Sequence, residues 1–209
     1  MSTLKFGLGD QVIVCIACYG NYGYGYGRTP EEMRGYDNYL DEIIGYIKTL
    51  IEIVRVELPL TIVVCGGKTN PNFDISEAET VYTELISRLE RTGLGRDKFN
   101  FITERQSANT TQNVFLGIDV ISRYGLLRLR NLSQHYIFIF DSLRAMKAIP
   151  IARLFCKKYG ILHWQVVGFN RPDIHPHSKW YKQFFVACLY WLPFIGRMLI
   201  ERDLKSSPA

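Results

Sequence analysis

A chain of 209 residues is long enough for one sizeable hydrophobic core but short for two full domains. Its composition, 47% hydrophobic and 22% charged, is that of an ordinary globular protein and excludes a low-complexity or fibrous chain. The net charge of +5 favours an anionic ligand or surface. A charge this small does not indicate nucleic acid, so we expect no nucleic-acid partner.

The cysteine pattern argues against a metal site. Cys15 and Cys18 form a C-x-x-C pair inside the apolar run 12–18, where residues three apart on a strand point to opposite faces. Such a pair cannot bind one metal or close a disulfide, and no second pair has zinc-site spacing. We therefore expect free buried thiols, no metal, and a reducing cytoplasmic compartment. The cysteines are Cys15, Cys18, Cys65, Cys156 and Cys188.

The most apolar stretch, Phe184 to Ile200, is interrupted by Pro193, Gly196 and Arg197. It is short for a membrane-spanning helix, and the N-terminal residues do not resemble a signal peptide. We expect no transmembrane span. The stretch predicts a helix-loop-helix that packs on the domain, or a surface patch.

Five short apolar runs predict buried strands. Their hydrophobicity is continuous rather than alternating, which is typical of strands covered on both faces in parallel sheets. The predicted strands are Gln11–Ala17, Leu60–Cys65, Lys98–Ile102, Tyr136–Phe140 and Leu162–Val167.

The segments between these strands carry helical periodicity. Leu40, Ile43, Ile44 and Ile47 follow the i, i+3, i+4, i+7 spacing. The pattern repeats after the second and third strands, and a weaker version follows the fourth. Alternating strands and helices predict a three-layer, doubly wound, mostly parallel α/β fold of Rossmann-like type. We expect this domain over residues 1–170, with a helical extension over 171–209 packed on it. Ligands of such folds bind beyond the carboxyl ends of the strands, so we expect the site in the loops that follow the strands.

The loop after the first strand, Tyr19 to Arg28, alternates Gly and Tyr. Glycines supply no packing, so this loop predicts either a lid whose tyrosines close over a flat ligand or a disordered surface loop. Tyr19 and Gly20 are its candidate ligand-binding residues. Thr29 is placed to cap the next helix, with Pro30 at its first position.

The loop after the second strand begins Gly66-Gly67-Lys68. Two glycines let backbone N–H groups approach an anion, and Lys68 could balance its charge. Ser76 and Glu79 match a capping box, so helix initiation is the plainest role of Ser76, although it also borders the site. The cap does not need Glu77, which makes that carboxylate a candidate for acid–base work.

The third loop, Glu104 to Asn113, is dense in amides and hydroxyls. Asn109 or Thr110 is a good N-cap, which leaves Glu104, Ser107 and Asn113 unexplained. We take Glu104 as a second candidate acid or base. Ser107, Asn109, Thr110 and Asn113 are candidates for binding a ligand's polar rim or for fixing the surrounding loops.

The fourth loop, Asp141 to Ala148, places Arg144 and Lys147 on one face of a helix at the mouth of the sheet. With Asp141 they are candidate ligand-binding residues, suited to a phosphate or carboxylate. An ion pair with Glu77, Glu104 or Asp141 explains the two cations equally well.

These loops resemble the YdcF/SanA/ElyC-type family of bacterial domains. The family pattern has a Gly-Gly turn followed by Ser-Glu-Ala, matched by Gly66-Gly67 and by the run 76–78. Its second motif is a Glu, a Ser and Asn-Thr-x-Glu-Asn, matched by Glu104, Ser107 and the run 109–113. The resemblance covers roughly Gln11 to Gly168, and two ordered motifs make it fairly specific.

The sequence departs from the family pattern at three positions. Gln112 stands where the family has Glu, and Arg144 and Lys147 stand where it has His and Arg. A mechanism that needs a neutral imidazole or that carboxylate could not operate unchanged. The resemblance implies a soluble YdcF-like protein linked to cell-envelope biogenesis, with S-adenosylmethionine as a possible ligand, and no transferable reaction.

Three hypotheses follow from the sequence. The first is an enzyme, possibly a group-transfer enzyme, that acts on a small nucleotide-like or phosphorylated ligand. The second is a non-catalytic ligand sensor, favoured by the loss of the family's His and of its second-motif Glu, at Arg144 and Gln112. The third is a membrane-surface accessory protein that touches lipid peripherally through residues 180–200. The sequence carries no indication of oligomeric state.

Overall fold

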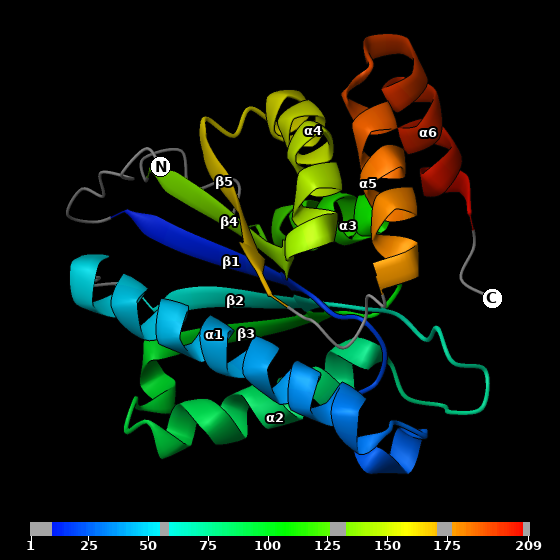
Figure 1. Ribbon diagram of the computed structural model, residues 1–209. Coiled ribbons are helices and arrows are strands. Elements are labelled where there is room, and N and C mark those ends of the chain that lie inside the picture. The colour runs from blue at the N-terminus through cyan, green and yellow to red at the C-terminus, as the bar shows by residue number, and fades with distance from the viewer. Residues whose placement is uncertain (1–9, 55–58, 126–132, 171–176, 207–209) are drawn as a thin grey trace.

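The computed structural model describes residues 10–54, 59–125, 133–170 and 177–206. Its centre is a sheet of five parallel strands in the order β3-β2-β1-β4-β5 (Figure 1). The strands are β1 Gln11–Ala17, β2 Leu60–Cys65, β3 Phe99–Glu104, β4 Gln134–Asp141 and β5 His163–Phe169. The three-layer, Rossmann-like α/β class predicted from the sequence is confirmed.

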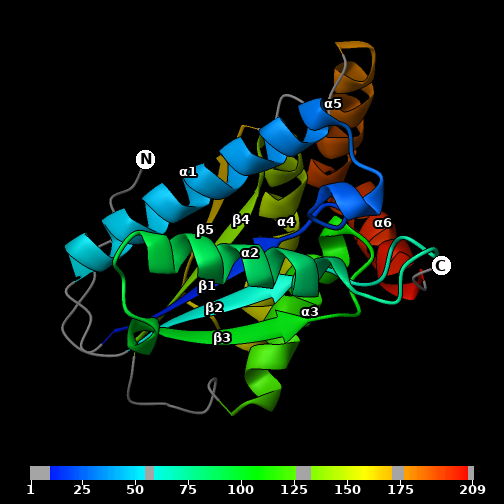
Figure 2. The same cartoon turned by 90° about the horizontal axis from the view of Figure 1, so that it is seen from below.

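Successive side chains of a strand point to opposite faces of the sheet, so these apolar strands present hydrophobic side chains on both faces. Helices cover both faces. On β1, Val12, Val14 and Ile16 join one buried cluster with the inner faces of α1 (Pro30–Val54) and α2 (Glu77–Arg91). Ile13, Cys15 and Ala17 join a second cluster with α3 (Thr110–Arg123) and α4 (Ser142–Tyr159). Figure 2, turned by 90°, shows α1 and α2 in front of the sheet.

The helices begin at the caps that the sequence predicts. Thr29 Oγ1 accepts the N–H of Glu32, and Ser76 and Glu79 form a complete capping box. Asn109 accepts the N–H of Gln112, which settles the choice between Asn109 and Thr110. Short 3-10 turns at Tyr24–Tyr26 and Arg96–Lys98 complete the regular structure.

The predicted bounds are confirmed for β1 and β2, whereas the bounds of β3, β4 and β5 differ from the prediction. β3 extends to Glu104, so this carboxylate ends a strand rather than opening a loop. β5 starts at His163, and Leu162 before it is 83% exposed. β5 is an edge strand and only half-buried, which explains why its apolar run was a poor guide to its start.

Two further helices lie beside α4, on the side of the sheet that α3 and α4 cover (Figure 1). They are α5 (His177–Trp191) and α6 (Pro193–Lys205); α5 packs on α4, and α6 contacts α3 and α5. Pro150 inside α4 has no N–H, which leaves the carbonyl of Met146 without its helical donor. The indole N–H of Trp191 donates to that oxygen at 3.2 Å and so ties α5 to α4.

No single described helix is long and apolar enough to cross a membrane. The segments Phe184–Trp191 and Pro193–Lys205 meet the length and composition test only as a pair, across a bend of 110°. Cys15, Cys18, Cys65 and Cys156 are free and buried as predicted. Cys188 is free but exposed, contrary to the prediction, because its position on α5 faces outward.

Candidate functional site

The strand order defines where a ligand can enter the sheet. The chain runs outward from β1 through β2 to β3, then crosses back to β4 and β5. Neighbouring loops therefore separate at the carboxyl ends of β1 and β4, and such switch points are where doubly wound sheets bind ligands. Tyr19 follows β1 there, and Asp141 and Arg144 follow β4.

Tyr19 and Arg144 meet across this switch point. The guanidinium carbon of Arg144 lies 3.7 Å from the centroid of the Tyr19 ring, a cation–π contact. Burial raises the pKa of the Tyr19 hydroxyl, whose oxygen has no hydrogen-bond partner among the described residues. Asp141 is the N-cap of α4: it accepts the N–H of Arg144, and its Oδ2 lies 3.5 Å from the guanidinium. Its carboxylate is therefore used as a cap and counter-ion.

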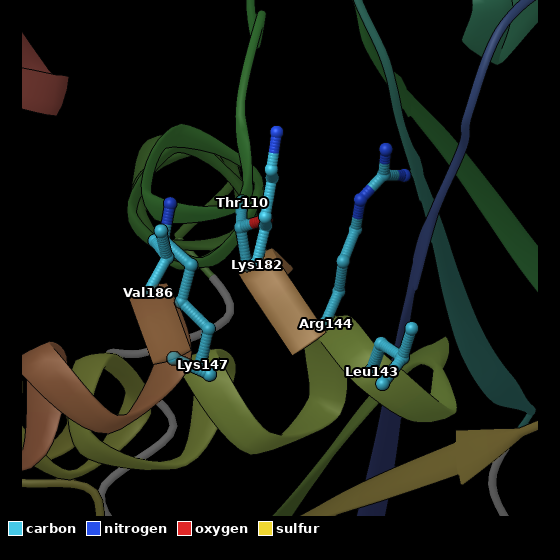
Figure 3. A pocket seen from close by; sticks show the side chains of 7 residues that line it. Thr110, Leu143, Arg144, Lys147, Lys182 and Val186 are labelled. Atoms are coloured by element: carbon cyan, nitrogen blue, oxygen red, sulfur yellow. The ribbon is translucent and has the colours of Figure 1, made fainter. Parts of the chain in front are cut away.

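A cavity of about 260 Å³ opens beside Arg144. Its lining comes from the first turns of α3 and α4 and from α5: Thr110, Leu143, Arg144, Lys147, Lys182, Val186 and Ala187. Figure 3 shows the side chains of Arg144, Lys147 and Lys182 projecting to the same side. Three cations on a partly apolar cavity suit a small anion or the anionic end of a larger ligand.

Lys147 is held by a carboxylate that the sequence hypotheses did not include. Its Nζ lies 3.0 Å from Oδ2 of Asp203 on α6, which also accepts from Thr111 and Tyr190. Asp203 is only 8% exposed. Burial acts to raise the pKa of Asp203, but the hydrogen bonds from Tyr190 and Lys147 and the charge of Lys147 lower it overall. The counter-ion of Lys147 is thus neither Glu77, Glu104 nor Asp141.

The amides of the third loop also contact α6. Gln112 Nε2 donates to the carbonyls of Asp203 and Ser206, and Asn109 Nδ2 donates to Asp203 O and Ser206 Oγ. A glutamate at position 112 could not make these donations, since a carboxylate only accepts. Gln112 and Lys147, two of the three departures from the family pattern, therefore both bind α6. Asn109, with both ends of its amide engaged, holds the C-terminal helix.

The loops after β2 and β3 are packed against each other. The N–H of Gly66 donates to Glu104 O, and that of Gly67 donates to Ser107 O. A Cβ at Gly67 would lie 2.8 Å from Ser107 O, and one at Gly66 would lie 2.9 Å from the Glu77 Cβ. The glycines thus permit close approach of two loops and a helix. Their N–H groups are used internally, not held open for an anion as the sequence suggested.

Glu104 is a buried carboxylate whose two oxygens differ in their contacts. Its Oε1 accepts the N–H groups of Gln106 and Ser107, whereas Oε2 has no partner among the described residues. Burial raises the pKa of Glu104 above its ordinary value, and the two N–H donors oppose this. Asn113 in the first turn of α3 is also buried, with its Oδ1 unpartnered in the described chain. A buried carboxyl of raised pKa fits a general acid or base.

The remaining second-loop candidates have partners close by. Glu77 is buried and accepts from the hydroxyl of Thr69, a residue that the sequence analysis did not single out. Ser76 is fully buried in its capping box, so helix initiation accounts for it. Lys68 is ion-paired with the exposed Asp74, so its charge is balanced within the loop.

The Tyr-Gly loop is anchored rather than open. Arg28 donates to the carbonyls of Tyr19 and Asn21, and the hydroxyl of Tyr36 donates to Gly20 O. Tyr19 and Tyr22 pack against the core cluster under α1 and α2, so alternation with glycine did not keep them out of the core. Tyr24, by contrast, is 63% exposed. The lid and disordered-loop interpretations are both weakened by these contacts.

Asp203 carried a signal that sequence reasoning missed. Gly196, Ile200 and Asp203 are the buried residues of α6 and follow the i, i+4, i+7 spacing of one helical face. An acidic residue in register with a buried face needs a basic or hydroxyl partner, and this requirement could have pointed to Lys147. No group of three His, Cys, Asp or Glu side chains in the described ranges could hold a metal ion.

Comparison with protein-family models, with curated proteins and with solved structures gives no match for this chain. The fold and the switch-point site define it as a Rossmann-like α/β protein with a cationic cavity. The resemblance to the YdcF/SanA/ElyC-type family rests on the two loop motifs alone.

Proposed function

We propose that this protein binds a small nucleotide-like or phosphorylated anion at the switch point and acts on it as a group-transfer enzyme. The observation that carries the proposal is the cavity lined by Arg144, Lys147 and Lys182 at the carboxyl ends of the strands. Lys147 has Asp203 as counter-ion and Arg144 has Asp141, while Lys182 forms no ion pair within the described part of the chain. An anionic ligand would supply the missing negative charge.

The proposal assigns acid–base chemistry to two carboxyl groups at the same end of the sheet, although neither of them lines the cavity. Glu104, and secondarily Glu77, would act as acid or base, and Asn113 would orient the ligand. The proposed YdcF-like kinship adds S-adenosylmethionine as a candidate ligand and cell-envelope biogenesis as a setting. Four buried free thiols support a reducing compartment such as the cytoplasm.

A second candidate, a non-catalytic sensor, is favoured by a specific observation. Gln112 and Lys147 are committed to α6 through Asp203, as is Asn109. A site whose polar groups hold a helix in place suits a protein in which ligand binding changes the position of that helix.

Ligand binding is tested first, with the purified full chain. Native mass spectrometry identifies any co-purified ligand, and thermal shift is then measured with pyrophosphate, ATP and S-adenosylmethionine. We expect Arg144→Met and Lys182→Met each to weaken binding about tenfold for whichever of these compounds the protein binds. The reason is that a charged hydrogen bond contributes about 1.5–3 kcal/mol. Lys157→Met removes the same charge at the far, exposed end of α4 and serves as control.

The results separate the candidates. An empty site with no response to any of the three compounds refutes the binding proposal, as does equal behaviour of the cavity and control variants. If binding is present, turnover of the ligand that is lost in Glu104→Gln or Glu77→Gln identifies an enzyme. Binding without turnover, unchanged by those substitutions, identifies a sensor.

A further inference from the structure

The outer surface of α5 and α6 exposes large apolar side chains. Phe185 is 63% exposed, Phe194 76% and Met198 56%. The exposed apolar set on these helices is Tyr181, Phe184, Phe185, Val186, Trp191, Leu192, Phe194, Ile195 and Met198. Contiguous exposed apolar surface of this kind marks a binding surface for a protein or a membrane.

Helical spacing arranges these side chains in two stripes. Tyr181, Phe184 and Phe185 follow the i, i+3, i+4 rule along α5, and Phe194, Ile195 and Met198 follow the same kind of spacing along α6. The two helices join at a bend of 110°. There Gly196 N–H bonds to Leu192 O, and a Cβ at Gly196 would overlap the Tyr190 carbonyl. We call α5, α6 and this bend the apolar hairpin.

The apolar hairpin also carries an excess of positive charge. Residues 177–206 contain five basic residues, Lys179, Lys182, Arg197, Arg202 and Lys205, against the two acidic residues Glu201 and Asp203. This excess of three accounts for more than half of the protein's net charge of +5. Asp203 pairs with Lys147 and also with Arg202, and Glu201 pairs with Arg197, so the excess of three corresponds to the lysines of the hairpin. Positive charge around exposed aromatic residues is complementary to an anionic lipid surface.

The inner face of the hairpin is bound to the domain by polar contacts. Asp203 joins Thr111, Lys147 and Tyr190, and Trp191 donates to Met146 O. Pulling these groups into hydrocarbon would leave them unsatisfied at a cost of several kcal/mol each. The hairpin is therefore suited to lie in the interface with its outer side chains in lipid, and not to cross the bilayer.

We propose that the apolar hairpin docks this protein on the surface of an anionic lipid bilayer, with Phe185, Phe194 and Met198 inserted below the headgroups. α5 also lines the cationic cavity through Lys182, Val186 and Ala187, so docking brings the mouth of that cavity to the membrane surface. The docking surface is separate from the proposed ligand chemistry and stands if that chemistry fails.

Vesicle co-sedimentation of the full chain tests the proposal. The test pair is Phe185→Ser with Phe194→Ser; the control pair, Ile53→Ser with Tyr124→Ser, removes two apolar side chains of comparable exposure, 63% and 66%, elsewhere on the molecule. We expect the wild type and the control pair to bind phosphatidylglycerol-rich vesicles. The test pair should bind at least about tenfold more weakly, since each buried aromatic side chain contributes substantially to interfacial affinity. Binding to phosphatidylcholine vesicles, or in about 0.5 M salt, should be weaker for the wild type.

Four results overturn the proposal. The first is failure of the wild type to sediment with phosphatidylglycerol-rich vesicles. The second is equal lipid binding by test and control pairs when circular dichroism shows both folded. The third is a wild-type dimer in lipid-free light scattering that the test pair converts to monomer without any lipid binding, because the surface is then occupied by a second copy. The fourth is resistance of bound protein to alkaline carbonate extraction, which would show a spanning segment instead of surface docking.

Discussion

The two helical layers that flank the sheet present opposite chemistry to their surroundings. On the α1–α2 side, Arg88 binds the carboxylates of Asp37, Asp41 and Glu84 and lies over the ring of Tyr22, a dense charged network typical of a water-facing surface. On the opposite side, the apolar hairpin exposes Phe185, Phe194 and Met198. The helices on both sides bury an apolar face against the core, so the two sides differ only in their outer surfaces. An α/β sheet requires helices that cover it, but this requirement does not explain an apolar outer surface.

The largest effect is expected where the hairpin is attached. Asp203→Ala removes the acceptor of Thr111, Lys147 and Tyr190 and leaves Lys147 without its carboxylate. We expect a loss of about 2–4 kcal/mol in the free energy of unfolding, measured in urea, because a partly buried cation loses its partner. Hydrogen exchange should show protection lost in α5 and α6 while α1 and α2 keep theirs. Glu201→Ala, which breaks only the exposed pair with Arg197, should change stability by less than about 0.5 kcal/mol.

The matching change on the other side is Arg88→Met. It removes the donors that join α2 to α1 and to Tyr22, and we expect a loss of about 2 kcal/mol in urea unfolding. Arg91→Met, whose side chain is 68% exposed, is the control and should be nearly neutral. The comparison between layers fails if Arg88→Met reduces hydrogen-exchange protection in α5 and α6 as much as in α1 and α2.

A pH measurement distinguishes the buried carboxyl of Glu104, at the end of β3, from the ion-paired carboxyl of Asp203 on α6. Burial raises the pKa of Glu104 in the folded state, so its contribution to stability is present below the unfolded pKa and is lost as pH rises through the folded pKa. Glu104→Gln removes this loss. We expect the stability advantage of the Gln variant over wild type to grow between about pH 4 and about pH 7 in urea titrations. An advantage that shrinks over that range would contradict the assignment.

The smallest effect is expected at the contact between α5 and α4. Trp191→Phe keeps an aromatic ring but leaves the Met146 carbonyl, already deprived of a donor by Pro150, without the indole N–H. The cost should be about 1 kcal/mol in thermal or urea unfolding. Tyr181→Phe on the same helix changes an exposed side chain and should stay within about 0.5 kcal/mol. Equal stability of the two variants would show that this hydrogen bond does not help to hold the hairpin on α4.

The candidate site was predictable in part. The caps at Ser76 and Asn109 and the position of Arg144 and Lys147 at the start of α4 follow from local patterns, because a cap acts within one helical turn. The partner of Lys147 did not follow, since Asp203 lies 56 residues further along the chain. Loop composition likewise could not distinguish glycines that cradle an anion from glycines that let Gly67 approach Ser107. That distinction depends on which loops are neighbours.

The sequence by itself determined the class of fold and the caps of α1 and α2, and it narrowed the cap of α3 to two residues. Continuous apolar runs and helical periodicity express short-range constraints that every parallel α/β sheet imposes. Only the tertiary structure decided the strand order, and with it the switch point at which Arg144 meets Tyr19. It also decided what the buried face of α5 and α6 packs against, because Tyr190 and Ile200 join the core cluster of α3 and α4 and Asp203 pairs with Lys147. Long-range pairing of this kind is decided by packing and is not encoded in any local pattern.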